Sequence, residues 1–407
     1  MSEKLGVLIV GAGGAVASTV IAGVALMKKG IVPRLGMLTE ADLGKKLPLS
    51  AIDDLEFGGW DIRTTDLFEA AKHHGVIPRH LLPEVEEELR ALRPWPAIVS
   101  PTFLAGDLGD NAVEGTSYRD QLRNMRAQIE AFKKERKLDR VVIVNLASTE
   151  RYTQIADVHV TPEAFEAGLD ANDPRISPAM RYLYLAIMTD TPHVNFTPSL
   201  SNIPALDTLS RKRGVPIAGE NGKTGQTLLK TVLAPAFAVR QLVVQGWYST
   251  NILGNNDGRV LDDPGSNKTK VTSKLGVLDN ILGYNVEDHQ VHIHYYRPRG
   301  DAKEAWDNID LLGFLGESMQ IKVNFLCRDS ILAAPLVVDL VRLMDVAHHA
   351  GECGVQRQFS VFFKSPYRVE GQPVVHDLFE QHRMLREWSE AVASAPRPVG
   401  AVAARAV

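Results

Sequence analysis

The stretch from Leu5 to Met27 carries no charged residue and is long enough to cross a bilayer, yet Gly11, Gly13 and Gly14 interrupt it. A glycine in a helix interior costs about 1 kcal/mol relative to alanine. The apolar, partly β-branched run before the glycines suits a buried parallel strand, and the alanine-rich run after them suits a helix. The pattern therefore predicts a strand, a glycine turn and a helix, and not a membrane span.

The composition is that of a globular protein, since 45% of the 407 residues are hydrophobic and 23% are charged. This balance excludes a largely disordered chain and a multi-span membrane protein. Lys and Arg number 45 against 49 Asp and Glu, so no basic excess favours nucleic acid or an anionic membrane as a partner. Two cysteines, Cys327 and Cys353, exclude a disulfide framework and predict a reducing, cytoplasmic compartment.

Strands and helices alternate through the first part of the chain. Residues 35–39 and 60–62 predict strand segments, and 66–74 predicts a helix. The charged amphipathic segment 115–137 predicts a long helix that runs into a buried strand at 141–144. Such alternation is typical of βαβ units and a mostly parallel sheet.

A different pattern follows in the second half. Residues 291–296 and 321–325 alternate apolar and polar with period two, as half-exposed strands do. Residues 331–349 return to a helical pattern. We therefore expect an open-sheet second domain between about 227 and 331.

The glycine turn is a candidate dinucleotide site. Glycines let the backbone approach a pyrophosphate, and the helix that follows offers unpaired N–H groups and a partial positive charge. The turn departs from the usual Gly-x-Gly-x-x-Gly pattern because Val16 stands at the third glycine. A plain strand-to-helix turn is the alternative, and Glu40 lies too far along the chain to serve as the ribose-binding acid.

A second polar, glycine-bearing turn at 219–227 also leads into a helical run. Thr224 is a candidate N-cap, and residues 225–227 could present backbone N–H groups to an anion. Lys223 would add positive charge there. A purely structural helix cap is the alternative reading.

Several lysines have no obvious structural purpose. Lys270 and Lys274 are four residues apart, so on a helix they share one face and repel each other. A phosphorylated substrate would supply the missing negative charge, and a lysine crowded by cations has a lowered pKa and can act as an acid or base. A solvated basic face is the alternative. Lys303 and Lys364 are isolated lysines in apolar or turn surroundings.

The histidines are weak metal-ligand candidates. The adjacent pairs His73-His74 and His348-His349 point in different directions on a helix. A strand face shared by residues 292 and 294 could hold a metal, but a third ligand is not evident. The sequence therefore leaves the presence of a metal unknown.

These features together resemble the myo-inositol-1-phosphate synthase family. The similarity runs from the first predicted strand to about Lys364, nearly the whole chain. Several blocks in the order of the family form a far more specific signal than the glycine turn alone. The blocks are Gly59-Trp60-Asp61-Ile62, Thr149-Glu150-Arg151-Tyr152, Thr224-Gly225-Gln226-Thr227, Leu253-Gly254-Asn255-Asn256-Asp257-Gly258, and Cys327-Arg328-Asp329-Ser330 followed by Leu332-Ala333.

The resemblance implies an α/β protein with a Rossmann-type NAD-binding domain and an inserted α/β catalytic and oligomerisation domain. The first would comprise residues 1–226 and 332–407, and the second residues 227–331. The family resemblance also implies a homotetramer. Because the chain lacks the long N-terminal extension of eukaryotic members, we expect a bacterial-type form.

The implied reaction is redox-neutral. Glucose 6-phosphate would be oxidised at C5 with bound NAD, the ketone would enolise toward C6, C6 would attack the C1 aldehyde, and the ring ketone would be reduced again. The product would be myo-inositol 1-phosphate, with the cofactor regenerated in every turnover.

The resemblance also carries site residues over by position. The expected NAD-contact residues are Gly11, Gly13, Gly14, Asp61, Ser148, Thr149, Asn255, Asn256, Asp257, Asp301, Asp329 and Ser330. The expected substrate-phosphate cradle is Thr224, Gly225, Gln226 and Thr227. The expected catalytic residues are Lys270, Lys274, Lys303 and Lys364.

The chemistry explains why the reaction needs these lysines. A C5 hydroxyl must lose its proton as hydride departs, which suits Lys270 as a base with a lowered pKa. An enolate oxygen and a developing C1 alkoxide need fixed cations, which suits Lys274, Lys303 and Lys364.

Four departures from the family pattern leave alternatives open. Ala15-Val16-Ala17 replaces the usual Asn-Asn-Gly, Glu220-Asn221 replaces an Asp-Asp pair, Thr224 replaces a Ser, and Ser148 replaces an Asn. The same chemistry on another sugar phosphate, such as fructose 6-phosphate closing to a five-membered ring, is one alternative. A non-catalytic NAD-binding homologue is the other.

Overall fold

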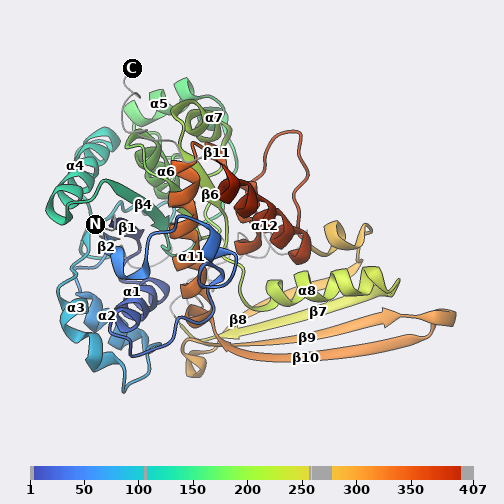
Figure 1. Cartoon of the computed structure of the whole chain (residues 1–407). Helices are drawn as coiled ribbons and strands as arrows, with labels where there is room; N and C mark the ends of the chain where they lie inside the picture. Colours follow the sequence, from blue (N-terminus) through green and yellow to red (C-terminus); the bar gives the residue numbers. More distant parts are fainter. Residues whose placement is uncertain (1–3, 105–107, 256–257, 259–276, 396–407) are drawn as a thin grey trace.

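The computed structural model describes residues 4–104, 108–255, 258 and 277–395, and it contains two sheets (Figure 1). The larger sheet is parallel and has the strand order β11-β6-β5-β4-β1-β2-β3. From β3 to β6 this is the order 3-2-1-4-5-6 of dinucleotide-binding folds. Its strands are β1 Leu5–Val10, β2 Leu55–Asp61, β3 Trp95–Pro96, β4 Arg140–Asn145, β5 His193–Asn195, β6 Pro216–Gly219 and β11 Gly354–Val355. The expected α/β fold class with a Rossmann-type domain is confirmed.

Helices cover both faces of this sheet, which is why β1 and β4 are apolar on both sides. One core lies between the sheet and the helices α1 (Ala15–Lys28) and α11 (Asp329–His349), which pack against each other. The opposite core contains residues of α4 to α7. The remaining helices are α2 Leu67–His74, α3 Glu86–Arg90, α4 Tyr118–Arg136, α5 Pro162–Asp170, α6 Pro178–Met188, α7 Pro204–Arg213 and α12 Leu378–Ser394.

The N-terminal region forms the predicted strand, glycine turn and helix. β1 ends at Val10 and α1 begins at Ala15, with the three glycines between them or at the cap. Among the described residues, we find no helix with the length and apolar character needed to cross a bilayer.

The strand expected at residues 35–39 is absent from this part of the described structure, and a short 3₁₀ helix spans Leu38–Glu40 instead. Asp339, on α11, accepts hydrogen bonds from the backbone N–H groups of Leu38 (2.7 Å) and Thr39 (3.0 Å). A side chain distant in sequence thus satisfies backbone donors that a neighbouring strand would otherwise have to satisfy.

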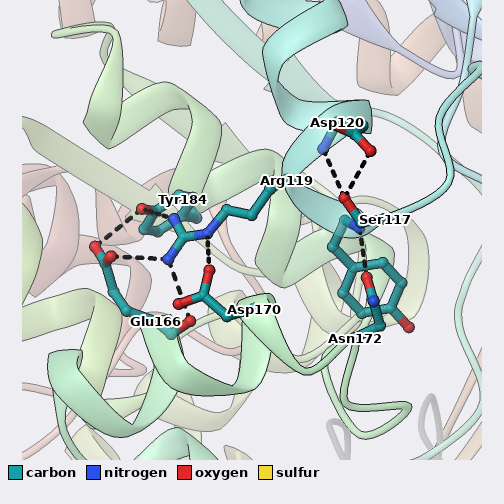
Figure 2. A network of polar contacts seen from close by, with 8 residues as sticks. Ser117, Arg119, Asp120, Glu166, Asp170, Asn172 and Tyr184 are labelled. Carbon is teal, nitrogen blue, oxygen red and sulfur yellow. Dashed lines mark hydrogen bonds and ion pairs between the residues drawn. The ribbon is translucent and has the colours of Figure 1, made fainter.

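Polar contacts fix α4 to its neighbours (Figure 2). The Ser117 hydroxyl accepts from the Asp120 N–H, and the Asn172 side chain accepts from the Tyr118 N–H at 2.6 Å. The Arg119 guanidinium donates to Asp170 of α5 at 2.7 Å. It also contacts Glu166 of α5 and Tyr184 of α6, so one arginine joins three helices.

The smaller sheet has the order β10-β9-β7-β8, in which β7 and β8 are parallel and β9 is antiparallel to β7 and β10. Its strands are β7 Val243–Leu253, β8 Asp288–Tyr295, β9 Ala302–Leu312 and β10 Ser318–Arg328. The helix α8 (Gly225–Val239) lies along one face of this sheet (Figure 1). The starts of α8 and α11 lie together, because the Thr224 hydroxyl donates to Asp329 at 2.8 Å.

Candidate active site

The glycine turn lies against the carboxyl end of β4. Gly11 has φ of +82°, and a Cβ there would stand 2.8 Å from the Cα of Ala147. Glycine is therefore required at this position for both conformation and space. Gly14 is the N-cap of α1 and provides no capping side chain, so the first turn of α1 keeps N–H groups available to an anion.

Asp61 ends β2 beside this turn. Its Oδ2 accepts from the Gly13 N–H at 2.8 Å, and its Oδ1 accepts from the Arg63 N–H at 3.0 Å. Burial raises the pKa of Asp61 even though both backbone hydrogen bonds favour its charged form. A carboxylate at the end of the second strand is placed as the ribose acceptor of Rossmann folds is. Glu40 does not take the role of ribose acceptor, because its carboxylate forms an ion pair with Arg342 at 2.6 Å.

A cavity of about 160 Å³ lies between the glycine turn, the loop after β4, and the starts of α8 and α11. It brings together residues from all three predicted groups, which are far apart in sequence. The predicted residues that line it are Gly14, Ser148, Thr149, Thr224, Asn255, Asp329, Ser330 and Lys364.

The second predicted anion cradle is the start of α8. Thr224 is the N-cap, but its hydroxyl donates to Asp329 Oδ1 at 2.8 Å and makes no capping bond within the described chain. The backbone N–H groups of the first turn therefore have neither an intrahelical acceptor nor a capping side chain among the described residues. Gly225 has φ of +61°, and a Cβ there would lie 3.5 Å from Lys303 Nζ.

Lys303 supplies positive charge at this helix start. Its side chain is almost completely buried, and its Nζ lies 3.4 Å from Asp329 Oδ1. An unpaired buried ammonium would be costly, so the Asp329 carboxylate compensates the charge. A phosphate entering the cavity would meet a cation and a helix N-terminus together.

The side chain of Gln226 is not available to the predicted anion cradle. Its amide nitrogen donates to the carbonyl oxygens of Thr250 (3.1 Å) and Trp306 (3.2 Å), and its amide oxygen accepts from Asn251. The side chain is thus used within the smaller sheet. The backbone N–H groups of Gln226 and of the buried Thr227 are the groups that remain for an anion.

The side chains of two lysines near the second glycine-bearing turn lie on different sides of that turn. Lys364 is nearly buried and lines the cavity, and its backbone N–H donates to the Asn221 carbonyl at 2.6 Å. Lys223 instead donates through Nζ to Gln381 of α12. Burial lowers the pKa of Lys223 to about 7. The expectation that Lys223 adds charge to the cradle is wrong, because its side chain lies on the side of the turn that faces α12.

A further polar cluster joins the smaller sheet to α11. Asp301 Oδ1 accepts from the Ser330 hydroxyl at 2.8 Å and from the Asn255 amide at 3.3 Å. Burial raises the pKa of Asp301, which these two hydrogen bonds oppose. Arg328 lies 4.0 Å from Asp301 Oδ2. The predicted residues Asn256, Asp257, Lys270 and Lys274 lie outside the described residues.

One residue in the cavity wall escaped the sequence analysis as a site residue. His74, the last residue of α2, has its Nε2 2.8 Å from the carbonyl oxygen of Gly13 and lines the cavity. The available signal was its position at the end of the helix that follows β2. No group of three or more His, Cys, Asp or Glu residues suited to a metal occurs among the described residues.

Comparisons with known proteins agree with this architecture. A family model described as myo-inositol-1-phosphate synthase, and named as NAD-binding, matches residues 5–389. The chain is 44% identical to inositol-3-phosphate synthase 1 of Bacteroides thetaiotaomicron, with 94% of each chain covered. It is 30% identical to inositol-3-phosphate synthase 1 of Oryza sativa, covering 94% of this chain and 84% of the relative.

A solved structure shows the same fold. The crystal structure of inositol-3-phosphate synthase from Caenorhabditis elegans superposes with a TM-score of 0.89 at 26% identity, covering 97% of this chain and 86% of that one. The family model spans nearly the whole chain. The chain therefore belongs to the myo-inositol-1-phosphate synthase family, an NAD-binding family.

Proposed function

We propose that this protein is an NAD-dependent cyclase that converts glucose 6-phosphate to myo-inositol 1-phosphate. The observation that carries the proposal is the convergence at one cavity of the glycine turn, the uncapped start of α8 and the buried Lys364, with the buried Lys303 3.4 Å from Asp329 in the cavity wall. A dinucleotide site next to a site for a sugar phosphate is what an internal oxidation and reduction requires.

The residues at the cavity suit a bound dinucleotide. The uncapped start of α1 would receive the pyrophosphate, and Asp61, beside the glycine turn, would accept from a ribose hydroxyl. Asn255, Asp301 and Ser330 would form the wall on the side of the smaller sheet. When bound, NAD accepts hydride from the C5 carbon of the sugar and returns it to the ring ketone.

The protein's own groups would bind the substrate and stabilise its charges. The backbone N–H groups of residues 225–227 would hold the phosphate, with Lys303 beside them. Lys364, which lines the same cavity, would face the developing oxyanion. Lys270 is proposed as the base at the C5 hydroxyl and Lys274 as a further fixed cation.

Product identification tests the proposal. Purified protein incubated with NAD⁺ and glucose 6-phosphate should yield myo-inositol 1-phosphate, identified by ³¹P and ¹H NMR. Lys270→Ala should abolish cyclisation while the variant still binds NAD⁺, and full activity of Lys270→Ala would contradict its role as the base.

A second substrate is favoured by one specific observation. Because Ala15-Val16-Ala17 places no polar side chain in the first turn of α1, the cofactor and sugar could sit differently from the family pattern. Turnover of fructose 6-phosphate to a carbocycle, with glucose 6-phosphate inert, would support this alternative. Turnover of neither sugar phosphate would point to a non-catalytic homologue.

We further propose that residues 227–331 form the catalytic and oligomerisation domain, and that the protein is a homotetramer. The strands of the smaller sheet all lie between residues 243 and 328, and α8 covers one face. The other face exposes Tyr248 (47%), Trp306 (49%) and Leu326 (60%). An apolar patch of this kind is typical of a subunit interface.

Light scattering tests the oligomer. Tyr248→Lys combined with Leu326→Lys should reduce the assembly below a tetramer, because two charges would have to be desolvated at each interface. Phe379→Lys, at an exposed position on α12, is the matched control. A double variant that stays tetrameric would exclude this face as the interface.

A cytoplasmic location is also proposed. Both cysteines are free thiols, as a reducing compartment would keep them. Fractionation of the source cells with an antibody to the protein would test the location.

A further inference from the structure

Gly13 of the dinucleotide turn is held from two sides. Its N–H donates to Asp61 Oδ2 at 2.8 Å, and its carbonyl oxygen lies 2.8 Å from His74 Nε2. A carbonyl oxygen can only accept, so Nε2 carries the proton in this contact. The peptide groups on both sides of Gly13 are therefore fixed in orientation by groups outside the turn.

The end of α2 also contacts the smaller sheet. Gly75, which follows His74, has φ of +63° and accepts from Arg328 Nη2 through its carbonyl oxygen at 2.6 Å. Arg328 ends β10 and lies 4.0 Å from Asp301. One helix end thus links the glycine turn to the polar cluster around Asp301.

The charged groups around His74 come from several elements. Asp61 lies at the end of β2, Asp301 immediately before β9, and the exposed His73 on α2 itself, while Arg328 approaches the adjacent peptide from β10. Burial lowers the pKa of His74, whereas the Gly13 carbonyl and the two carboxylates raise it. The imidazole is therefore neutral near physiological pH. The first turn of α1, Ala15-Val16-Ala17, lies at the same cavity and has no polar side chain.

We propose that His74 is a cofactor-positioning residue with two actions on NAD binding. Its Nε2–H holds the Gly13 carbonyl, and with it the start of α1, in the position where the first-turn N–H groups of α1 would face the pyrophosphate. Protonation of His74 adds a positive charge to the cavity wall, and this charge would attract the negatively charged pyrophosphate. The inference rests on the proposed binding of NAD at this cavity.

The second action fixes the sign of a pH dependence. A bound pyrophosphate stabilises the imidazolium, so the pKa of His74 is higher in the complex than in the free protein. Binding then takes up protons, and affinity for NAD⁺ must rise as pH falls through this interval. The neutral ring keeps the Gly13 contact, so binding persists at higher pH.

Calorimetric titration of the full chain with NAD⁺ at about pH 6 and about pH 8 tests both actions. We expect the wild type to bind more tightly at the lower pH. His74→Phe should bind about tenfold more weakly and lose the pH response, because it loses both the hydrogen bond and the charge. His74→Gln keeps a donor near the position of Nε2 without the charge, so it should bind as the wild type does at the higher pH and show no pH response.

His80→Phe is the matched control, since it removes an exposed histidine that does not line the cavity and should behave as the wild type does. Wild-type affinity and pH response in both His74 variants would overturn the inference while leaving the cofactor site intact. A wild-type protein that binds no NAD⁺ would overturn the cofactor assignment itself, and the inference with it.

Discussion

The helices α4 and α8 both begin after a hydroxyl residue, Ser117 and Thr224, yet the two hydroxyls do opposite things. At α4 the Ser117 oxygen accepts from the Asp120 N–H and closes the helix end (Figure 2). At α8 the Thr224 hydroxyl donates to Asp329 and leaves the helix end open. The partner that the fold supplies, and not the residue type, separates the structural cap of α4 from the proposed anion site of α8.

The same division extends over other helices. α1 and α11 also start at the cavity without a capping side chain, whereas α2, α5, α6 and α12 start elsewhere and are capped by Asp66, Thr161, Ser177 and Asp377. α3 and α7 are also uncapped away from the cavity, but α3 directly continues the 3₁₀ helix Leu82–Val85, and α7 begins with a proline, which has no N–H to satisfy. The longer helices other than α7 thus lack a capping side chain only at the cavity where we propose that anions bind.

The largest expected effect comes from removing the cation at the open helix start. Lys303→Met should lower kcat by about 100-fold or more, because the phosphate and developing charge lose a fixed ammonium. Steady-state kinetics would measure this, with Lys72→Met at an exposed site on α2 as the control. A Lys303→Met variant with normal kcat would show that the open end of α8 is not part of the reaction site.

A smaller effect is expected when the Thr224 hydroxyl is removed. Thr224→Val leaves Asp329 without this donor, so its carboxylate would repel the incoming phosphate and raise KM for the sugar phosphate about tenfold. Thr224→Ser retains the donor and should have normal KM. If Thr224→Val altered only thermal stability, the hydroxyl would be a structural cap like that of α4.

The smallest effect is expected at the closed helix end. Ser117→Ala should lower the free energy of unfolding by about 1 kcal/mol, the usual value of an N-cap. Urea denaturation would measure the loss, and KM and kcat should stay unchanged because α4 is remote from the cavity. A change in KM would mean that the ends of α4 and α8 are not as separate as the structure indicates.

The sequence alone predicted those features that depend on local chemistry. Gly11 was identifiable because a positive φ and a close backbone approach admit only glycine. Continuous apolar runs likewise located β1 and β4, and the period-two alternation located β8 and β10. By contrast, the 3₁₀ helix at Leu38–Glu40 depends on Asp339, three hundred residues away, which no local pattern reveals.

Within the site, the directions in which side chains point could not be predicted from the sequence. Lys223 was expected to add charge to the second anion cradle, but its side chain instead bonds to Gln381 of α12. Gln226 was expected at the phosphate, but its side chain is used by the smaller sheet. His74 was judged only as a metal ligand, a test that could not detect a contact with a backbone carbonyl.

The 2.8 Å bond between Thr224 and Asp329 joins the two points at which the chain leaves the larger sheet and comes back to it. A module whose entry and exit adjoin in this way can be removed with little change to its host. We expect a chain in which a short glycine–serine linker connects residue 224 to residue 329 to fold as a miniature nucleotide-binding protein. Cooperative melting of that shortened chain, at a temperature raised by added NAD⁺, would show that the nucleotide-binding part folds and binds without the smaller sheet.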